Sequence, residues 1–263
     1  MLKLQNVNIT FLKGTPDEKH ALKSINLNVK KGDFISIIGA NGAGKSTLFN
    51  VISGRYLSDT GRIILDEKDV TSMPEHKRAK SIGRLFQDPM KGSAPEMSIE
   101  ENLALAAGHG GWMSRISKAD RNLFREKLSM LGMGLEDRMK QPVGLLSGGQ
   151  RQALTLMMAT IQSPKLLLLD EHTAALDPAT AETVLKITSE IVSENDLTCL
   201  MITHNMQSAL DLGNRTIMMD NGRIIYDVSG KDREGLKIKD LLDKFRSSVG
   251  KDLDNDRMML NEY

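Results

Sequence analysis

The sequence predicts an α/β protein: a core with a parallel sheet, a small antiparallel β subdomain near the N-terminus and an inserted helical subdomain. Three short segments, 34–38, 166–169 and 198–202, are apolar throughout, as buried parallel strands tend to be. Strand-like and helix-like segments follow one another along the chain, which is typical of an α/β fold. This alternation breaks from about Met90 to Ala159, where the sequence reads as helices and loops only. We therefore expect a helical subdomain inserted there.

The strand candidates are rich in β-branched residues and lie at 4–11, 25–29, 34–38, 62–65, 166–169, 198–202, 216–219 and 223–227. Apart from the three apolar segments, they alternate polar and apolar residues, as strands with one solvent-facing side do. Helix candidates lie at 45–53, 99–107, 118–131, 148–162, 178–194 and 205–212. We expect one domain over residues 1–230, with the helical subdomain at about 90–159, followed by a C-terminal helix and tail over 231–263.

The C-terminal segment carries charges of both signs and one amphipathic helix candidate. The apolar residues that recur there at helical spacing are Ile238, Leu241, Leu242, Phe245 and Val249. After Gly250 the composition predicts a loosely held tail.

The overall charge favours no class of partner. The chain has 35 Lys and Arg against 34 Asp and Glu, a formal net charge of +1. Polyanions would therefore bind at local sites rather than through an overall field. The charge argues neither for nor against nucleic acid, which we do not expect as a partner.

The cysteine content and the lack of long apolar runs indicate a cytoplasmic protein. The single cysteine, Cys199, rules out an internal disulfide and fits a reducing compartment. It lies in the apolar run 198–203, so we expect an inert core thiol. The N-terminal stretch MLKLQNVNITF lacks the apolar region of a secretory signal, and no apolar run approaches the ~20 residues that span a bilayer. By itself the chain is expected to be soluble.

The stretch Gly39-Ala-Asn-Gly-Ala-Gly-Lys-Ser-Thr47 lies between a predicted strand and a predicted helix, and it fits the pattern G-x-x-x-x-G-K-[ST]. Its glycines let backbone N–H groups approach phosphate oxygens, and the following helix adds the partial positive charge of its N-terminus. Lys45 would bind the β- and γ-phosphates, and Ser46 would bind Mg²⁺. The alternative is an ordinary glycine-rich turn. The pattern predicts a nucleoside triphosphate site in a P-loop NTPase core (RecA-like), and by itself leaves kinases, GTPases, helicases and transporters open.

A second candidate phosphate-binding element lies about a hundred residues further on. Leu146-Ser-Gly-Gly-Gln150 precedes a helical run, so Ser147, Gly148 and Gly149 fall where a helix would begin, with a capping serine and bare backbone donors. Two such elements in one chain either close over one nucleotide or each serve a site shared with a partner chain.

With this LSGGQ stretch the sequence resembles the ATP-binding cassette (ABC) family, whose signature is LSGGQ. The other family motifs follow in order over about residues 2–228. They are the Q-loop with Gln87, the Walker B strand Leu166-Leu-Leu-Leu-Asp-Glu171, the D-loop Ala175-Leu-Asp177, the switch histidine His204, and Phe11 at the position of the aromatic that stacks on adenine. The resemblance implies that ATP is bound by Phe11, by Gly39, Ala40, Asn41, Gly42, Ala43, Gly44, Lys45, Ser46 and Thr47, and by Ser147, Gly148, Gly149 and Gln150 of a second subunit.

The two carboxylates after the Walker B strand predict distinct roles. Asp170 ends a buried strand, where a carboxylate is costly unless a cation compensates it, and Mg²⁺ would do so. Glu171, one position on, points to the other side and can orient or deprotonate the attacking water. The alternative for this Asp-Glu pair is a helix N-terminus. The resemblance adds Gln87 as a contact to Mg²⁺ and water, and His204 as a γ-phosphate contact. Each of these residues also has a structural alternative. Gln87 would be a plain surface glutamine, His204 a structural histidine and Phe11 an aromatic that only packs.

One departure from the family is His172. Most members carry proline after the Walker B glutamate; histidine frees φ and adds an N–H and a titratable ring beside the base. The stretch Glu171-His-Thr-Ala-Ala-Leu-Asp-Pro178 resembles a subgroup of stand-alone importer ATPases, which work with a membrane permease and a lipoprotein receptor for amino acids, including the aromatic tryptophan and tyrosine.

The resemblance implies the ATP-hydrolysing subunit of an ABC transporter. Two subunits would sandwich two ATP molecules head to tail, and the helical subdomain would pass the motion to separate permease subunits at the cytoplasmic face of the membrane. The alternatives are an exporter subunit and a soluble, non-transport ABC ATPase. Ribosome-associated members usually carry two cassettes and DNA-repair members a long coiled coil, and this chain has one set of motifs and no sustained heptads. A purely regulatory module would be expected to lose Lys45 or Glu171, and this chain has both.

Overall fold

The computed structural model describes residues 1–108 and 116–249. The chain divides into two compact units. Unit 1 combines Met1–Ile82 with Asp196–Tyr263, and unit 2 is Gly83–Asn195. Unit 2 is longer than the helical subdomain predicted at about 90–159, because it also includes the strand and the helix that follow residue 159.

The N-terminal part of unit 1 is an antiparallel sheet of β1 (Leu2–Phe11), β2 (Lys19–Val29), β4 (Thr60–Leu65) and β5 (Lys68–Asp69), in the order β2-β1-β4-β5. Leu2 faces Val29 on one side and Leu65 on the other. The buried residues Leu2, Leu4, Val7 and Ile9 give β1 one core-facing side, interrupted by irregularities in the register. The predicted antiparallel subdomain is confirmed, and its second strand begins six residues earlier than predicted.

Unit 1 also contains β3 (Phe34–Ile38), β8 (Thr198–Ile202), β9 (Arg215–Asp220) and β10 (Arg223–Ser229), in the order β10-β9-β3-β8. β3 pairs in parallel with β8 and β9, and β10 is antiparallel to β9. Every residue of β3 and β8 is buried, as predicted. The prediction of alternating exposure for 216–219 was wrong: all four residues are buried, because β9 pairs on both edges and is covered by helices on a face.

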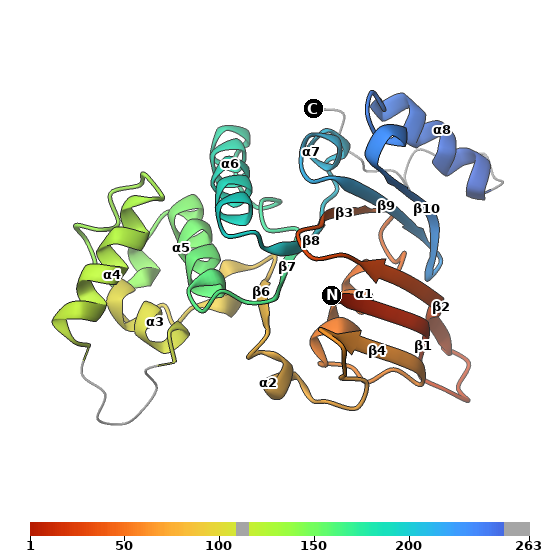
Figure 1. Cartoon of the computed structure of the whole chain (residues 1–263), viewed down its shortest axis with the longest axis horizontal. Helices are drawn as coiled ribbons and strands as arrows, with labels where there is room; N and C mark the ends of the chain where they lie inside the picture. Colours follow the sequence, from red (N-terminus) through yellow and green to blue (C-terminus); the bar gives the residue numbers. More distant parts are fainter. Residues whose placement is uncertain (109–115, 250–263) are drawn as a thin grey trace. The chain divides into compact units, whose positions relative to one another are not determined.

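The helices of unit 1 are α1 (Lys45–Ser53), α2 (Glu75–Arg78), α7 (Met206–Asp211) and α8 (Ile238–Val249), with the 3-10 turn η3 (Gly230–Asp232). In Figure 1, α7 and α8 lie over the β9–β10 side of the sheet. Their buried side chains form one core cluster with this sheet, made of Ile38, Met206, Ala209, Met218, Leu241 and Phe245. The predicted C-terminal helix is therefore confirmed and packed. The predicted tail after Gly250 lies outside the described residues.

Unit 2 contains the neighbouring strands β6 (Ile82–Leu85) and β7 (Leu166–Asp170), and a group of helices coloured yellow to teal in Figure 1. These are η1 (Pro89–Gly92), α3 (Ile99–Ala106), α4 (Lys118–Ser129), η2 (Val143–Leu145), α5 (Gly148–Thr160) and α6 (Pro178–Glu194). Capping boxes at Ser98 and Ser117 explain where α3 and α4 begin. Between residues 90 and 159 the described residues form helices, turns and one isolated bridge, from Ser98 to Pro142.

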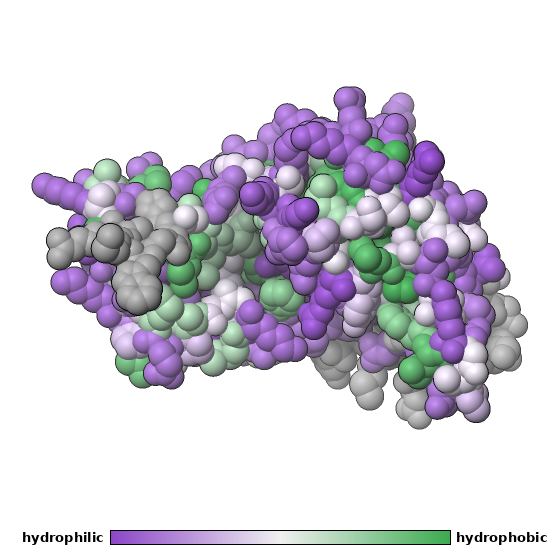
Figure 2. Space-filling model, turned by 90° about the horizontal axis from the view of Figure 1, so that it is seen from below, coloured by the Kyte–Doolittle hydropathy of each residue, from purple (hydrophilic) through white to green (hydrophobic). Residues whose placement is uncertain are grey.

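Hydrophilic side chains dominate the face shown in Figure 2, and hydrophobic ones gather there in small separate groups. Within 1–108 and 116–249, no helix has the length and apolar character needed to cross a bilayer.

Candidate functional site

The glycine-rich loop of unit 1 connects the end of β3 to the start of α1. Gly39, Gly42 and Gly44 have φ of 148°, 81° and 102°, which residues with a side chain rarely adopt. A Cβ on Gly39 would collide with the carbonyl oxygen of Met219, and one on Gly44 would lie 2.7 Å from the carbonyl oxygen of Ala21. The loop therefore turns closely against the backbone around it, and these three positions require glycine.

Lys45, the first residue of α1, lies inside this loop. Its side chain is buried, and Nζ donates to the carbonyl oxygens of Gly39 at 2.6 Å and Ala40 at 3.1 Å. Asn41 and Ser46 remain exposed on the same loop. An ammonium group held beside glycine backbone and a helix N-terminus fits the phosphates of a nucleotide.

A turn remote in sequence supports the loop. Gly222, between β9 and β10, donates its N–H to the carbonyl of Ala43 at 2.9 Å and accepts from the N–H of Lys23 at 2.8 Å. Its φ of 76° and the 2.7 Å approach of the Ala21 carbonyl to a Cβ at this position require glycine. Sequence reasoning missed Gly222, because an isolated Asn-Gly turn predicts a hairpin and gives no sign of its neighbour.

The other two predicted site residues of unit 1 lie at strand ends. His204 follows β8 and is half-buried, two residues before α7 begins. Phe11 ends β1 and is half-buried against Tyr56, with ring centroids 5.3 Å apart and an edge-to-face angle of 74°. Tyr56 was not predicted. This edge-to-face contact with Tyr56 favours a defined orientation of the Phe11 ring.

In unit 2, Asp170 ends β7 after four leucines that are completely buried. Its Oδ2 lies 3.7 Å from Nη2 of Arg84, and both side chains are nearly buried. Arg84 comes from β6, and its guanidinium carbon lies 4.7 Å from the ring centroid of Phe86. Arg84 is thus a cationic partner of this carboxylate that the sequence did not reveal, and the expected compensation by Mg²⁺ stays a prediction.

Glu171 has the left-handed backbone conformation, with φ of 47°. Its carbonyl accepts from the N–H of Ala174 at 3.0 Å, which closes a tight turn directly after β7. This conformation costs a residue with a side chain about 1–2 kcal/mol, so the surrounding structure must hold it.

His172 is buried, with 3% of its surface exposed. Its Nε2 lies 3.1 Å from Oγ1 of Thr188 on α6. Burial lowers the pKa of His172 to about 4. This titratable ring, next in sequence to the predicted base, is therefore neutral around neutral pH.

The signature residues begin α5 in unit 2. The hydroxyl oxygen of Ser147 accepts from the N–H of Gln150, and the Gln150 side chain accepts from the N–H of Ser147, so the predicted capping serine is confirmed within a capping box. A Cβ on Gly149 would collide with the side chain of Thr180, at the start of α6. Asp177 caps α6, and the hydrogen bonds from Thr180 hold the pKa of its carboxyl below the usual range.

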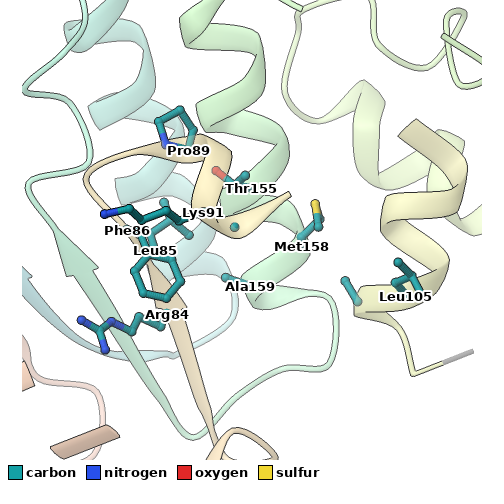
Figure 3. Close-up of a pocket in the computed structure, with 11 residues that line it drawn as sticks. Arg84, Leu85, Phe86, Pro89, Lys91, Leu105, Thr155, Met158 and Ala159 are labelled. Carbon is teal, nitrogen blue, oxygen red and sulfur yellow. The ribbon is translucent and has the colours of Figure 1, made fainter. Parts of the chain in front are cut away.

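A groove of about 350 Å³ lies beside the Q-loop in unit 2. Figure 3 shows its lining from β6 and η1 on one side and from α3 and α5 on the other; the residues are Arg84, Leu85, Phe86, Pro89, Lys91, Gly92, Leu105, Ala106, Thr155, Met158 and Ala159. Gln87 is exposed two residues after the end of β6, next to Phe86 and two residues before Pro89.

Each unit thus gathers part of the predicted site. Unit 1 carries Phe11, the loop 39–47 and His204, and unit 2 carries Gln87, the signature, Asp170 and Glu171. The individual roles of these residues remain predictions.

Comparison with known proteins identifies the family. The sequence profile described as ABC transporter matches residues 22–174. The chain is 40% identical over 251 residues to a tyrosine transport ATP-binding protein of Clostridioides difficile, covering 95% of this chain and all of that protein. It is 34% identical over 236 residues to the methionine import ATP-binding protein MetN of Streptococcus agalactiae, covering 87% of this chain and 64% of that longer protein.

Solved structures agree with this match. A dimeric ATP-binding cassette in a post-hydrolysis state with ADP and Pi aligns with a TM-score of 0.75 at 29% identity, over 87% of this chain and 98% of that one. An ABC transporter cassette in its ADP conformation aligns with a TM-score of 0.78 at 27% identity, over 95% and 99%. The α/β P-loop fold and the match over the whole length of the tyrosine transport ATP-binding protein agree on the family. The chain belongs to the ABC transporter family, as an ATP-binding subunit that hydrolyses ATP.

Proposed function

We propose that the chain powers import of an amino acid, with tyrosine as the first candidate, through a separate membrane permease. The observation that carries this proposal is the 40% identity with a tyrosine transport ATP-binding protein over that protein's whole length. The likeness to methionine import proteins supports the broader class of amino-acid importers.

The residues fit ATP and Mg²⁺. Lys45 and the backbone of Gly39–Ser46 would hold the phosphates, and Phe11 would stack on the adenine. The hydroxyl of Ser46, the amide oxygen of Gln87 and the carboxylate of Asp170 are hard oxygen ligands of the kind that Mg²⁺ prefers. When bound, Mg²⁺ would neutralise charge on the phosphates.

For hydrolysis, Glu171 would take the proton of the attacking water, and His204 would contact the γ-phosphate. The strained backbone of Glu171 supports this assignment, because such conformations cluster where a side chain must be presented at a reacting centre. Gln87 would orient water and metal from its exposed position after β6.

Two copies of the chain would form the active unit, with Ser147, Gly148, Gly149 and Gln150 of one copy completing the ATP site of the other. The dimeric state of the solved relative with ADP and Pi supports this arrangement. The cap geometry of Ser147 also presents a helix N-terminus, which favours a bound phosphate.

Separate permease subunits would hold the dimer at the cytoplasmic face of the membrane, and a lipoprotein would deliver the solute outside. The groove in Figure 3 is a candidate contact for the permease, since it joins the strand before Gln87 to the helix that begins with the signature. A permease bound there could respond to motion at both motifs.

Uptake and co-purification test this proposal. A tagged chain should co-purify with permease subunits from detergent extracts, and deletion of its gene should lower uptake of labelled tyrosine and leave that of an unrelated solute unchanged. Tyrosine efflux that falls while uptake stays normal would favour an exporter. A chain that co-purifies with no membrane protein would favour a soluble ABC ATPase.

A further inference from the structure

His172 is a buried polar side chain to which the proposed ATP site assigns no task. It directly follows Glu171, 3% of its surface is exposed, and its Nε2 lies 3.1 Å from Oγ1 of Thr188. Thr188 is itself completely buried, on the inner face of α6.

The direction of the hydrogen bond between His172 and Thr188 follows from a second bond that the Thr188 hydroxyl makes. Oγ1 of Thr188 donates to the carbonyl oxygen of Val184 at 2.8 Å, one turn earlier in α6. A hydroxyl has a single proton, so Thr188 can only accept from His172. The network therefore assigns the ring proton to Nε2, and the hydrogen bonds run from His172 through Thr188 to the α6 backbone.

The backbone next to His172 needs support. Glu171 has a φ of 47°, and the N–H of Ala174 closes the turn onto its carbonyl at 3.0 Å. Such a conformation persists only where neighbouring structure holds it. On the N-terminal side β7 provides this support, and on the C-terminal side the first anchored side chain is that of His172.

We propose that His172 is a positioning residue for ATP hydrolysis, which ties the turn that presents Glu171 to helix α6 through Thr188. The inference rests on the proposed role of Glu171 as the base. It requires that loss of the bond slows the chemical step and spares ATP binding, because neither side chain belongs to the phosphate loop.

Three variants of the full chain test this. Thr188→Val keeps the shape but removes the acceptor, so kcat should fall about 10- to 100-fold, the effect of a misplaced reacting group, with KM for ATP nearly unchanged. Thr188→Ser keeps the hydroxyl and should restore kcat. The matched control is Thr183→Val: Thr183 is an exposed threonine of α6 whose hydroxyl donates to Ala179 at 3.0 Å, and its loss should change nothing.

A spectroscopic readout is independent of turnover. Long-range ¹H–¹⁵N spectra of the labelled chain should show His172 as the neutral Nε2–H form, with its signal identified by its loss in His172→Pro. Thr188→Val should shift this signal, and Thr183→Val should leave it in place.

His172→Pro separates a positioning role from a direct one. Proline restrains φ by its ring, and the Thr188 hydroxyl keeps its Val184 partner, so kcat should fall only a few-fold. Adding Thr188→Val to this variant should cost little more, because both polar partners are then gone. This double variant also decides the matter if Thr188→Val alone fails to fold.

The proposal is overturned if Thr188→Val and Thr188→Ser have equal kcat, if ATP KM rises in step with any loss, or if the ring proton lies on Nδ1. A hundredfold loss in His172→Pro would instead assign His172 a direct catalytic role. Normal turnover in Glu171→Gln would remove the proposed base while leaving the assigned His172 bond measurable, so the two failures can be told apart.

Discussion

Two charged residues of the candidate site, Lys45 and Asp170, are buried or nearly buried, and each has a polar or charged partner close by. Lys45 donates to two loop carbonyls, and Asp170 lies 3.7 Å from the guanidinium of Arg84. Both are groups whose charged forms would otherwise be penalised by burial. Their partners stabilise these charges, which the proposed site would use to hold a nucleotide and its metal.

Glu171 gives the residue-scale prediction. Glu171→Gln keeps the shape of the side chain and loses its basicity, so turnover should fall by the amount typical of a lost general base, roughly 10²–10⁴-fold. Lys45, Ser46 and Asp170 are intact, so ATP should still bind and the chain should form a stable dimer with ATP. Phosphate release and size-exclusion chromatography with and without ATP measure both effects. Near-normal turnover would place the base elsewhere, with His204 as the first candidate.

At the scale of elements, segments with a helical period or a continuous apolar run could be predicted, and very short segments could not. Helices α1 and α6 and strands β3 and β8 have the predicted limits. The missed elements, β5, α2 and β6, have two to four residues, too few to show a period.

The same limit applies to the site. The sequence marks the motif residues because the chemistry fixes their spacing, as in the loop with Lys45 and Ser46, and their roles stay predictions. Their supports could not: Gly222, Tyr56, Arg84 and Thr188 are remote in sequence from the residues they touch. Only the fold brings them there, so no local pattern marks them.

The short helix α2 illustrates what such an element contributes. Its last residue, Arg78, is buried and caps the C-terminal end of α1, with Nη1 donating to the carbonyls of Val51 at 2.9 Å and Ile52 at 2.8 Å. It also donates to Met73 at 2.7 Å and Thr71 at 3.0 Å. Burial lowers the pKa of Arg78 to about 10, which leaves it charged at neutral pH and favourably placed at the negative end of a helix.

Arg78→Met should therefore destabilise unit 1. The change fills similar space but removes the guanidinium donor from four carbonyls, of which Val51 keeps the N–H of Gly54, so the free energy of unfolding should fall by about 2–4 kcal/mol. Urea denaturation measures the loss. Arg62→Met, on the exposed face of β4, is the control and should have little effect. An Arg78→Met protein as stable as the parent would show that water satisfies these carbonyls.

At the scale of the whole molecule, the functional residues are divided between two compact units. The phosphate loop and the signature lie in different units of the chain, about a hundred residues apart in sequence. The solved relative is a dimer with ADP and Pi, and a two-fold dimer pairs each surface patch with its counterpart on the other copy. If the sites are shared, a defect in the loop of one copy and a defect in the signature of the other fall on the same site.

Mixing two inactive variants tests that arrangement. Lys45→Ala should lose ATP binding, because the loop loses the ammonium that reaches the β- and γ-phosphates, and Ser147→Arg should block the signature. In a mixed dimer both defects fall on one site and the other stays intact, so an equal mixture should recover roughly a quarter of the parent turnover. Differently tagged subunits, purified in sequence on both tags, confirm that mixed dimers have formed. If these dimers hydrolyse no more ATP than either variant alone, each chain must complete its own site.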